Sequence, residues 1–79
     1  MSTSPEQLAA ALVDFRRLLE PVRLADTHEQ RIDALGLAQN NLFMLWRIDW
    51  IDRETFDVLH REVLQADADG VRRCEAKRG

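Results

Sequence analysis

Very few side chains of this 79-residue chain are suited to catalysis at neutral pH. His28 and His60 are the only residues whose side chains titrate near neutrality, and Cys74 is the only thiol. Most of the serine and threonine residues stand where helices are expected to begin, and capping explains them there. The sequence shows no set of nucleophile, base and orienting residue. It therefore predicts a protein that is not an enzyme, in which both histidines have structural or solvated roles.

Cys74 lies in a basic environment, among Arg72, Arg73 and Lys77, which favours the thiolate. Such a thiolate could form a bridge to a second chain, but a free thiol without a function is the simpler interpretation. A single cysteine excludes an internal disulfide. One cysteine and two distant histidines also lack the ligand spacing of a zinc site. We expect no metal and no other cofactor.

The segment QADADG, Gln65 to Gly70, superficially resembles the start of a calcium-binding loop. An EF-hand loop needs an acid at its first position and a glutamate at its twelfth. Gln65 would stand first and Ala76 twelfth, with Glu75 one residue early. We therefore interpret the segment as the solvated end of a helix rather than as a metal site.

These residues must be positioned by helices, and the first helix has a clear start. Ser4 and Gln7 have the spacing of a capping box, and Pro5 suits the first helical position. An apolar stripe follows at helical spacing: Leu8, Leu12, Phe15, Leu19 and Val22. Pro21 lacks an N–H and would clash with the carbonyl group four residues earlier. We expect this helix to end or kink near Glu20.

A second helix has two possible starts, because Asp26 with Glu29 and Thr27 with Gln30 both have the capping-box spacing. Its periodic apolar positions are Ile32, Leu35, Leu42 and Trp46. Gly36 lies inside it and weakens the helix by ~1 kcal/mol relative to alanine. The glycine either carries that cost or permits the close approach of a neighbouring helix.

The start of the third helix is the clearest. Asp52 can cap it, and Ile51 can pack on Phe56 as a hydrophobic staple. Glu54 lies in the first turn, where the helix dipole favours a carboxylate. Gly70 is a plausible stop, although the residues after it could continue the helix.

The pattern predicts one all-α domain over residues 1–79. Its helices are expected at about 5–20, 27–48 and 52–69, with a basic tail at 71–79. The short link between the second and third helices makes them an antiparallel hairpin, to which the N-terminal helix is added. So small a chain leaves much of its surface exposed, and without a disulfide or a metal the remaining aid to stability is oligomerisation. We therefore expect a homodimer.

The run NLFMLWRIDW, Asn41 to Trp50, contains both tryptophans and is the most apolar part of the chain. Successive helical residues turn by ~100°, so the apolar side chains of this run point in every direction. Either they form a thick end of the core, or part of them forms an oligomer or partner interface. The small size of the chain favours the interface. The residues predicted to make it are Phe43, Met44, Trp46, Ile48 and Trp50.

These features favour a small protein-interaction module that regulates or inhibits a protein partner through a self-associating helical scaffold. An acidic face on the third helix, formed by Glu54, Asp57 and Glu62, is a further candidate for contact with that partner. The alternative is a DNA-binding regulator in which the second and third helices form a helix-turn-helix. Acids at the start of the presumed recognition helix oppose it, so nucleic acid is not the expected partner.

The charge and hydropathy of the chain give a last expectation, on location. The net charge is −3. The N-terminal residues MSTSPEQ have neither a basic nor an apolar region of the kind that directs export. No apolar run approaches the ~18 residues of a membrane span. We expect a cytoplasmic protein that does not contact a membrane.

Overall fold

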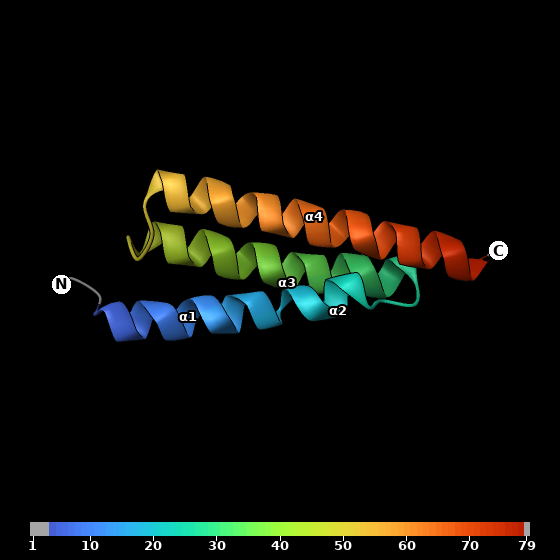
Figure 1. Cartoon of the computed structure of the whole chain (residues 1–79), viewed down its shortest axis with the longest axis horizontal. Helices are drawn as coiled ribbons and strands as arrows, with labels where there is room; N and C mark the ends of the chain where they lie inside the picture. The colour runs from blue at the N-terminus through green and yellow to red at the C-terminus, as the bar shows by residue number, and fades with distance from the viewer. Residues whose placement is uncertain (1–3, 79) are drawn as a thin grey trace.

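The computed structural model describes residues 4–78, and the side chains of residues 4–77. Every regular element in these residues is a helix. In chain order they are α1 (Pro5–Arg17), α2 (Leu19–Arg23), α3 (His28–Arg47) and α4 (Arg53–Arg78). The short α2 continues in the general direction of α1, so the helices form three rods that lie side by side (Figure 1). The all-α class and the packing of three helical rods are confirmed.

The break between α1 and α2 confirms the expected effect of proline. Pro21 lies inside α2, and the carbonyl group that its ring excludes is that of Arg17, the last residue of α1. Leu18 separates the two helices with near-helical dihedral angles, φ −69° and ψ −18°. The chain therefore kinks there rather than turning away, slightly earlier than the expected position near Glu20.

Side-chain caps fix the starts of α1 and α3. The Gln7 N–H donates to Ser4 Oγ at 3.1 Å, and the Ser4 N–H donates to Gln7 Oε1 at 3.3 Å, so the predicted box is complete. At α3, Thr27 Oγ1 accepts a hydrogen bond of 3.1 Å from the Gln30 N–H. Gln30 Oε1 in turn accepts from the Asp26 N–H at 3.1 Å. Of the two possible starts, the one with Thr27 as the cap is therefore used.

A Schellman turn ends α3. Asp49 has a positive φ of 62°, and its N–H donates to the Trp46 carbonyl at 3.1 Å. The Trp50 N–H donates to the Leu45 carbonyl at 3.0 Å, and these two bonds are the pair that defines this turn. Trp50 is half-buried and packs against the core. Such an apolar contact after the turn is typical of the motif.

The start of α4 follows the predicted pattern. Asp52 Oδ1 accepts a hydrogen bond of 2.8 Å from the Thr55 N–H. Ile51 and Phe56 are both buried in the same apolar cluster, as a hydrophobic staple requires. The connection from α3 is short, and the two helices run antiparallel (Figure 1).

The predicted stop at Gly70 is wrong, because α4 continues through it to Arg78. Gly70 is instead a site of close helix approach: an added Cβ would overlap the carbonyl oxygen of Val22 in α2. No atom of the chain lies within 4 Å of a Cβ built on Gly36, so the close approach considered for Gly36 does not occur within the chain. The predicted tail is helical as far as it is described. Residues 1–3 and 79 lie outside the described part.

The core runs along the axis of the molecule. α2 packs against both α3 and α4, whereas α1 packs against α3. The largest fully buried side chains are Phe15, Leu19, Leu42, Leu59, Val22 and Val63. No polar or charged residue is buried among those that the structure describes. Apolar packing therefore holds the rods together, and charged groups are left for the surface.

Candidate protein-interaction surface

Exposed apolar side chains gather on α3. Ten large hydrophobic residues are exposed in the described part of the chain. Six of them belong to α3 or to the residue that caps its C-terminus: Ile32, Leu37, Phe43, Met44, Trp46 and Ile48. Single exposed apolar residues are ordinary, whereas a group of them on one element indicates a binding surface. The helix therefore buries one side in the core and exposes apolar groups on the other.

The structure separates the five predicted interface residues into two groups. Phe43, Met44, Trp46 and Ile48 are exposed, with Met44 exposed to 54% and Trp46 to 36%. Trp50 is half-buried, since the turn after α3 directs it onto the core. Trp50 belongs to the closed end of the core, and the other four remain candidates for contact.

An aromatic corner lies where the C-terminal part of α3 meets the start of α4. The ring of Phe56 lies 4.6 Å from that of Trp46 and 5.5 Å from that of Phe43, measured between centroids. His60 also stacks on Phe56, with the ring centroids 5.8 Å apart. The guanidinium of Arg53 lies 5.7 Å from the centroid of the Trp46 ring, within cation–π range. His60 therefore has a packing role, as expected.

The sequence did not reveal this corner, because its members come from two helices. Sequence spacing marks Phe56 as a staple residue and a member of the apolar stripe of the third helix, and it links neither His60 nor Arg53 to a tryptophan. The distance along the chain between Trp46 and His60 gives no sign that both rings contact the same phenylalanine. The antiparallel hairpin supplies that contact, since it brings the end of α3 alongside the start of α4.

A second surface, the outer face of α3, lies opposite the buried side of that helix. We define it by Ile32, Asp33, Gly36, Leu37, Asn40, Phe43, Met44, Arg47 and Ile48. At ~100° per residue these positions lie away from the buried residues Ala34, Ala38, Leu42 and Leu45. A groove of about 460 Å³ lies on this face, lined by Asn40, Phe43, Met44, Arg47 and Ile48. The face is apolar at its margins and carries one amide and two charges along its middle.

Two of the three acidic residues predicted to face a partner are paired with arginine side chains. Glu62 accepts two hydrogen bonds of 3.0 Å from Arg16 in α1, and this pairing raises the pKa of Arg16. Asp57 Oδ1 accepts a hydrogen bond of 3.2 Å from Arg53 Nε. Glu54 lies exposed in the first turn of α4. Two of the three carboxylates are thus neutralised by arginine, and a common acidic face receives no support from their arrangement.

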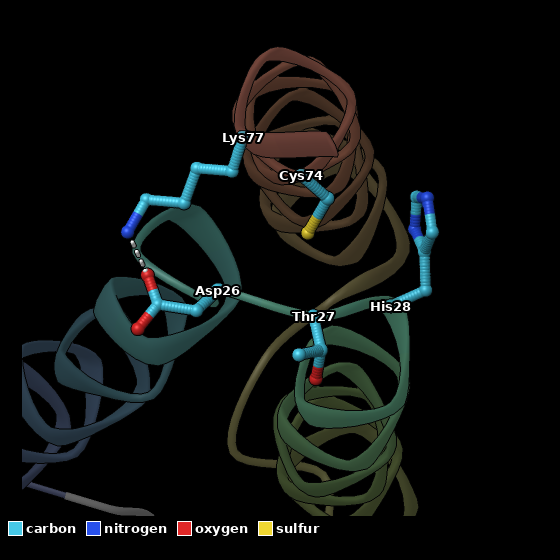
Figure 2. A pocket seen from close by; sticks show the side chains of 5 residues that line it. All are labelled: Asp26, Thr27, His28, Cys74 and Lys77. Atoms are coloured by element: carbon cyan, nitrogen blue, oxygen red, sulfur yellow. Dashed lines mark hydrogen bonds and ion pairs between the residues drawn. The ribbon is translucent and has the colours of Figure 1, made fainter. Parts of the chain in front are cut away.

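The predicted basic tail is the last part of α4, and two of its basic side chains, Arg73 and Lys77, bind the α2–α3 connection. Arg73 Nε donates to the carbonyl oxygen of Leu24 at 3.2 Å. Lys77 reaches across to the carboxylate of Asp26 (Figure 2). The hydrogen bond from Lys77 holds the pKa of Asp26 below its ordinary value, and Arg73 adds to this effect. These side chains tie two parts of the chain together and are not free for phosphate contacts.

Cys74 lies beneath these groups and is only 4% exposed. Its thiol donates to the carbonyl oxygen of Ala25, with Sγ 3.5 Å from that oxygen. A small pocket of about 230 Å³ is lined by Asp26, Thr27, His28, Cys74 and Lys77. The side chains of Thr27 and His28 point away from the thiol (Figure 2), and His28 Nε2 lies 3.1 Å from Glu75 Oε1. A buried thiol with no base beside it does not favour a bridge to a second chain.

The acidic segment from Gln65 to Gly70 lies in the middle of α4, so it is not a metal-binding loop. Asp67 binds the guanidinium of Arg31 in α3. Asp69 binds Arg72 one turn later, and that hydrogen bond lowers the pKa of Asp69. No group of three or more histidine, cysteine, aspartate or glutamate side chains with the arrangement of a metal site occurs in residues 4–77.

Comparisons of this chain with protein-family models, with curated proteins and with solved structures each found no match. The role of the protein must therefore be argued from its own residues. Within the described helices, none combines the length and apolar character needed to cross a bilayer. The surfaces on α3 are the strongest candidates for function, because six of the ten exposed large hydrophobic residues of the described part lie on this helix or its C-terminal cap.

Proposed function

We propose that this chain is a small non-enzymatic helical module that associates with itself and binds and regulates a protein partner. The observation that carries the proposal is the concentration of exposed apolar side chains on α3. Tryptophan, phenylalanine, methionine and arginine are enriched in protein interfaces, and the two surfaces on α3 contain all four types. Tryptophan in particular often contributes a large share of the binding energy.

The two surfaces suit different tasks. The outer face of α3 is a long strip on one helix, with apolar margins and an amide and two charges along its middle. The aromatic corner is compact and joins two helices, with Trp46 part-exposed above the buried ring of Phe56. An anchor of this kind, fixed from behind by a second ring, loses little conformational entropy on binding. We assign self-association to the outer face and partner contact to the aromatic corner.

A DNA-binding role has weaker support. The two helices of a helix-turn-helix cross at about 90–120°, whereas α3 and α4 run alongside each other (Figure 1). The first turn of α4 follows Asp52 and contains Glu54, which would repel phosphate. At the other end of α4, Arg73 and Lys77 are bonded within the chain. A protein partner accounts better for the exposed apolar groups.

The proposal is tested by capturing partners from an extract of the cells that express this protein. The purified chain serves as bait, beside Trp46→Ala at the aromatic corner and Met44→Glu on the outer face. Val13→Glu is the matched control, because Val13 is exposed to 50% but lies on α1. We expect specific proteins to be retained by the unchanged chain and by the control, and to be lost from Trp46→Ala. Equal retention by all four baits, or no retained protein, would contradict the proposal.

A further inference from the structure

The outer face of α3 has features that nothing in its own chain explains. Gly36 weakens the helix, yet an added Cβ there would meet nothing within 4 Å. Asp33 and Arg47 form no ion pair with any residue of the described part, although nine other ion pairs do occur there. Leu37 is exposed to 63%, the most of any large hydrophobic residue described. A second helix could pack against this face. Gly36 would give it room, Asp33 and Arg47 would give it charges to pair with, and the apolar margins would give it contact area.

We propose that the outer face of α3 binds the same face of a second copy of this chain. The two α3 helices run antiparallel, with the two-fold axis passing beside Asn40. This inference rests on the proposed self-association and names its face and register. A two-fold contact uses one surface patch on both subunits, so each residue type must meet its complement on that same patch.

The charges select the antiparallel direction. Asp33 and Arg47 lie at equal distances along α3 on either side of Asn40. In an antiparallel pair centred there, Asp33 of each copy faces Arg47 of the other, which gives two symmetric ion pairs. A parallel pair would place Asp33 beside Asp33 and Arg47 beside Arg47, and like charges that face each other are unfavourable. The charges of α3 are therefore complementary to those of a second α3 that runs in the opposite direction.

The apolar groups fit the same register. Gly36 of one copy faces Phe43 of the other, and the missing Cβ leaves room for that ring. Leu37 of one copy faces Met44 of the other, so both apolar margins of the face are covered. Trp46 lies outside the contact and stays at the aromatic corner.

The amide of Asn40 meets its own counterpart on the axis. An amide has both donors and an acceptor, so two copies can bond to each other. Asparagine within a helix interface is known to fix register, because a shifted pair would bury the amide without a partner.

The size of α3 is adequate for this contact. With twenty residues it is about 30 Å long. A stable protein interface buries about 1,200–2,000 Å² in total. The groove near Met44 would supply only part of that area. Contact from Ile32 to Ile48 is needed, and the exposed apolar residues extend over that whole length.

The register is tested by reversing the two charges separately and together. The dimer dissociation constant is measured by sedimentation equilibrium, with reductant present, for Asp33→Arg, Arg47→Glu and the double variant. We expect each single reversal to raise the constant by about tenfold or more and the double variant to return it to within a few-fold of the original. Arg17→Glu on α1 is the control and should change little. Far-UV circular dichroism checks that every variant is folded.

Gly36→Leu is a second, independent variant. Leucine is a better helix former than glycine, and a Cβ at this position meets no atom of its own chain within 4 Å, so the monomer should unfold at the same or a higher temperature. It would block the Phe43 ring of the second copy, so we expect at least a tenfold weaker dimer. A dimer unchanged by Gly36→Leu would overturn the inference, and so would a double reversal that fails to restore association.

The same measurements separate this inference from the proposed function. A chain that is monomeric at every concentration, yet loses a captured protein when Trp46 is changed, overturns the α3 dimer and leaves partner binding intact. A chain whose charge reversals compensate, but which captures no protein, supports the α3 dimer and overturns partner binding.

Discussion

At the scale of single residues, two glycines of the helices have opposite environments. Gly70 lies against the backbone of α2, whereas Gly36 faces open space. We predict that Gly70→Ala lowers the free energy of unfolding by about 1–3 kcal/mol, because the Val22 carbonyl cannot move away without shifting α2. At concentrations where the chain is monomeric, Gly36→Ala should raise it by up to ~1 kcal/mol. Urea unfolding of both variants at equal protein concentration measures the difference, and similar effects of the two would contradict it.

Asp49 is the one residue other than glycine with a positive φ among those described. Glycine adopts this conformation without steric cost, whereas aspartate tolerates it only moderately. Asp49→Gly should therefore stabilise the chain by about 0.5–1 kcal/mol. Thermal unfolding is the measurement, with Asp49→Val as the contrasting variant, because a β-branched residue is strongly disfavoured there and should lower the melting temperature.

Three exposed carboxylates should make the chain sensitive to strong acid. Their pKa values are lowered from 3.8: that of Asp26 by Lys77, that of Asp52 by the Thr55 N–H, and that of Asp69 by Arg72. A lowered folded-state pKa means that the stabilisation is present above the unfolded value and is lost as the pH falls through the folded one.

We therefore predict that these groups leave the unfolding free energy constant between about pH 5 and pH 7. The unfolding free energy should then decrease as the pH falls below 3.8, the ordinary pKa of aspartate. Denaturant unfolding across that range is the measurement. Asp26→Asn removes one of the three groups, so its acid-induced loss should be smaller than that of the unchanged chain. An identical pH dependence in this variant would show that the Asp26–Lys77 pair does not contribute.

At the scale of elements, the helices differ in how firmly they are held. α1 contributes one buried residue, Phe15, whereas α3 contributes four. α1 packs against α3 and is joined to α4 through the pair of Arg16 and Glu62. Few buried contacts make an element open more easily than the rest of a domain.

We predict that amide hydrogens of α1 exchange faster than those of α3 and of the middle of α4. Hydrogen exchange followed by mass spectrometry measures this. Arg16→Ala should accelerate exchange in α1 further, and Arg17→Ala, whose partner Asp14 lies in the same helix, should not. Uniform protection across the three rods would show that α1 is as firmly held as the others.

Local signals of the sequence predicted where the helices begin, and contacts between distant residues decided the rest. Ser4, Thr27 and Asp52 cap helices through neighbours three residues away, so their roles are readable from spacing. The role of Gly70 depends on Val22, which is far away in the chain, and spacing alone suggested a helix stop. The turn at Asp49, with its positive φ, likewise gives the two tryptophans different environments: Trp50 packs on the core, whereas Trp46 stays exposed. The apolar run alone does not distinguish them.

At the scale of the whole molecule, the chain is a rod with extents of 51 × 19 × 15 Å. Its radius of gyration is 13.7 Å, whereas a compact domain of this length would have about 12 Å. We predict that small-angle X-ray scattering of the dimer gives a longest dimension clearly above 51 Å, because the axis beside Asn40 is nearer one end of the rod. A dimer whose two rods lie side by side with their ends level would keep the single-chain length, and that result would contradict the register.

The off-centre position of Asn40 has a mechanical consequence for the proposed pair. α4 extends to the end of the rod opposite the α3–α4 turn (Figure 1). In the pair, the two turns lie on opposite sides of the axis, each about 12 Å from it along the helices, and the ends of the two α4 helices point away from each other at the two extremes. The two aromatic corners would then lie near the centre of an elongated dimer. A partner that binds both corners would be engaged bivalently, while anything carried near Arg78 would be held apart.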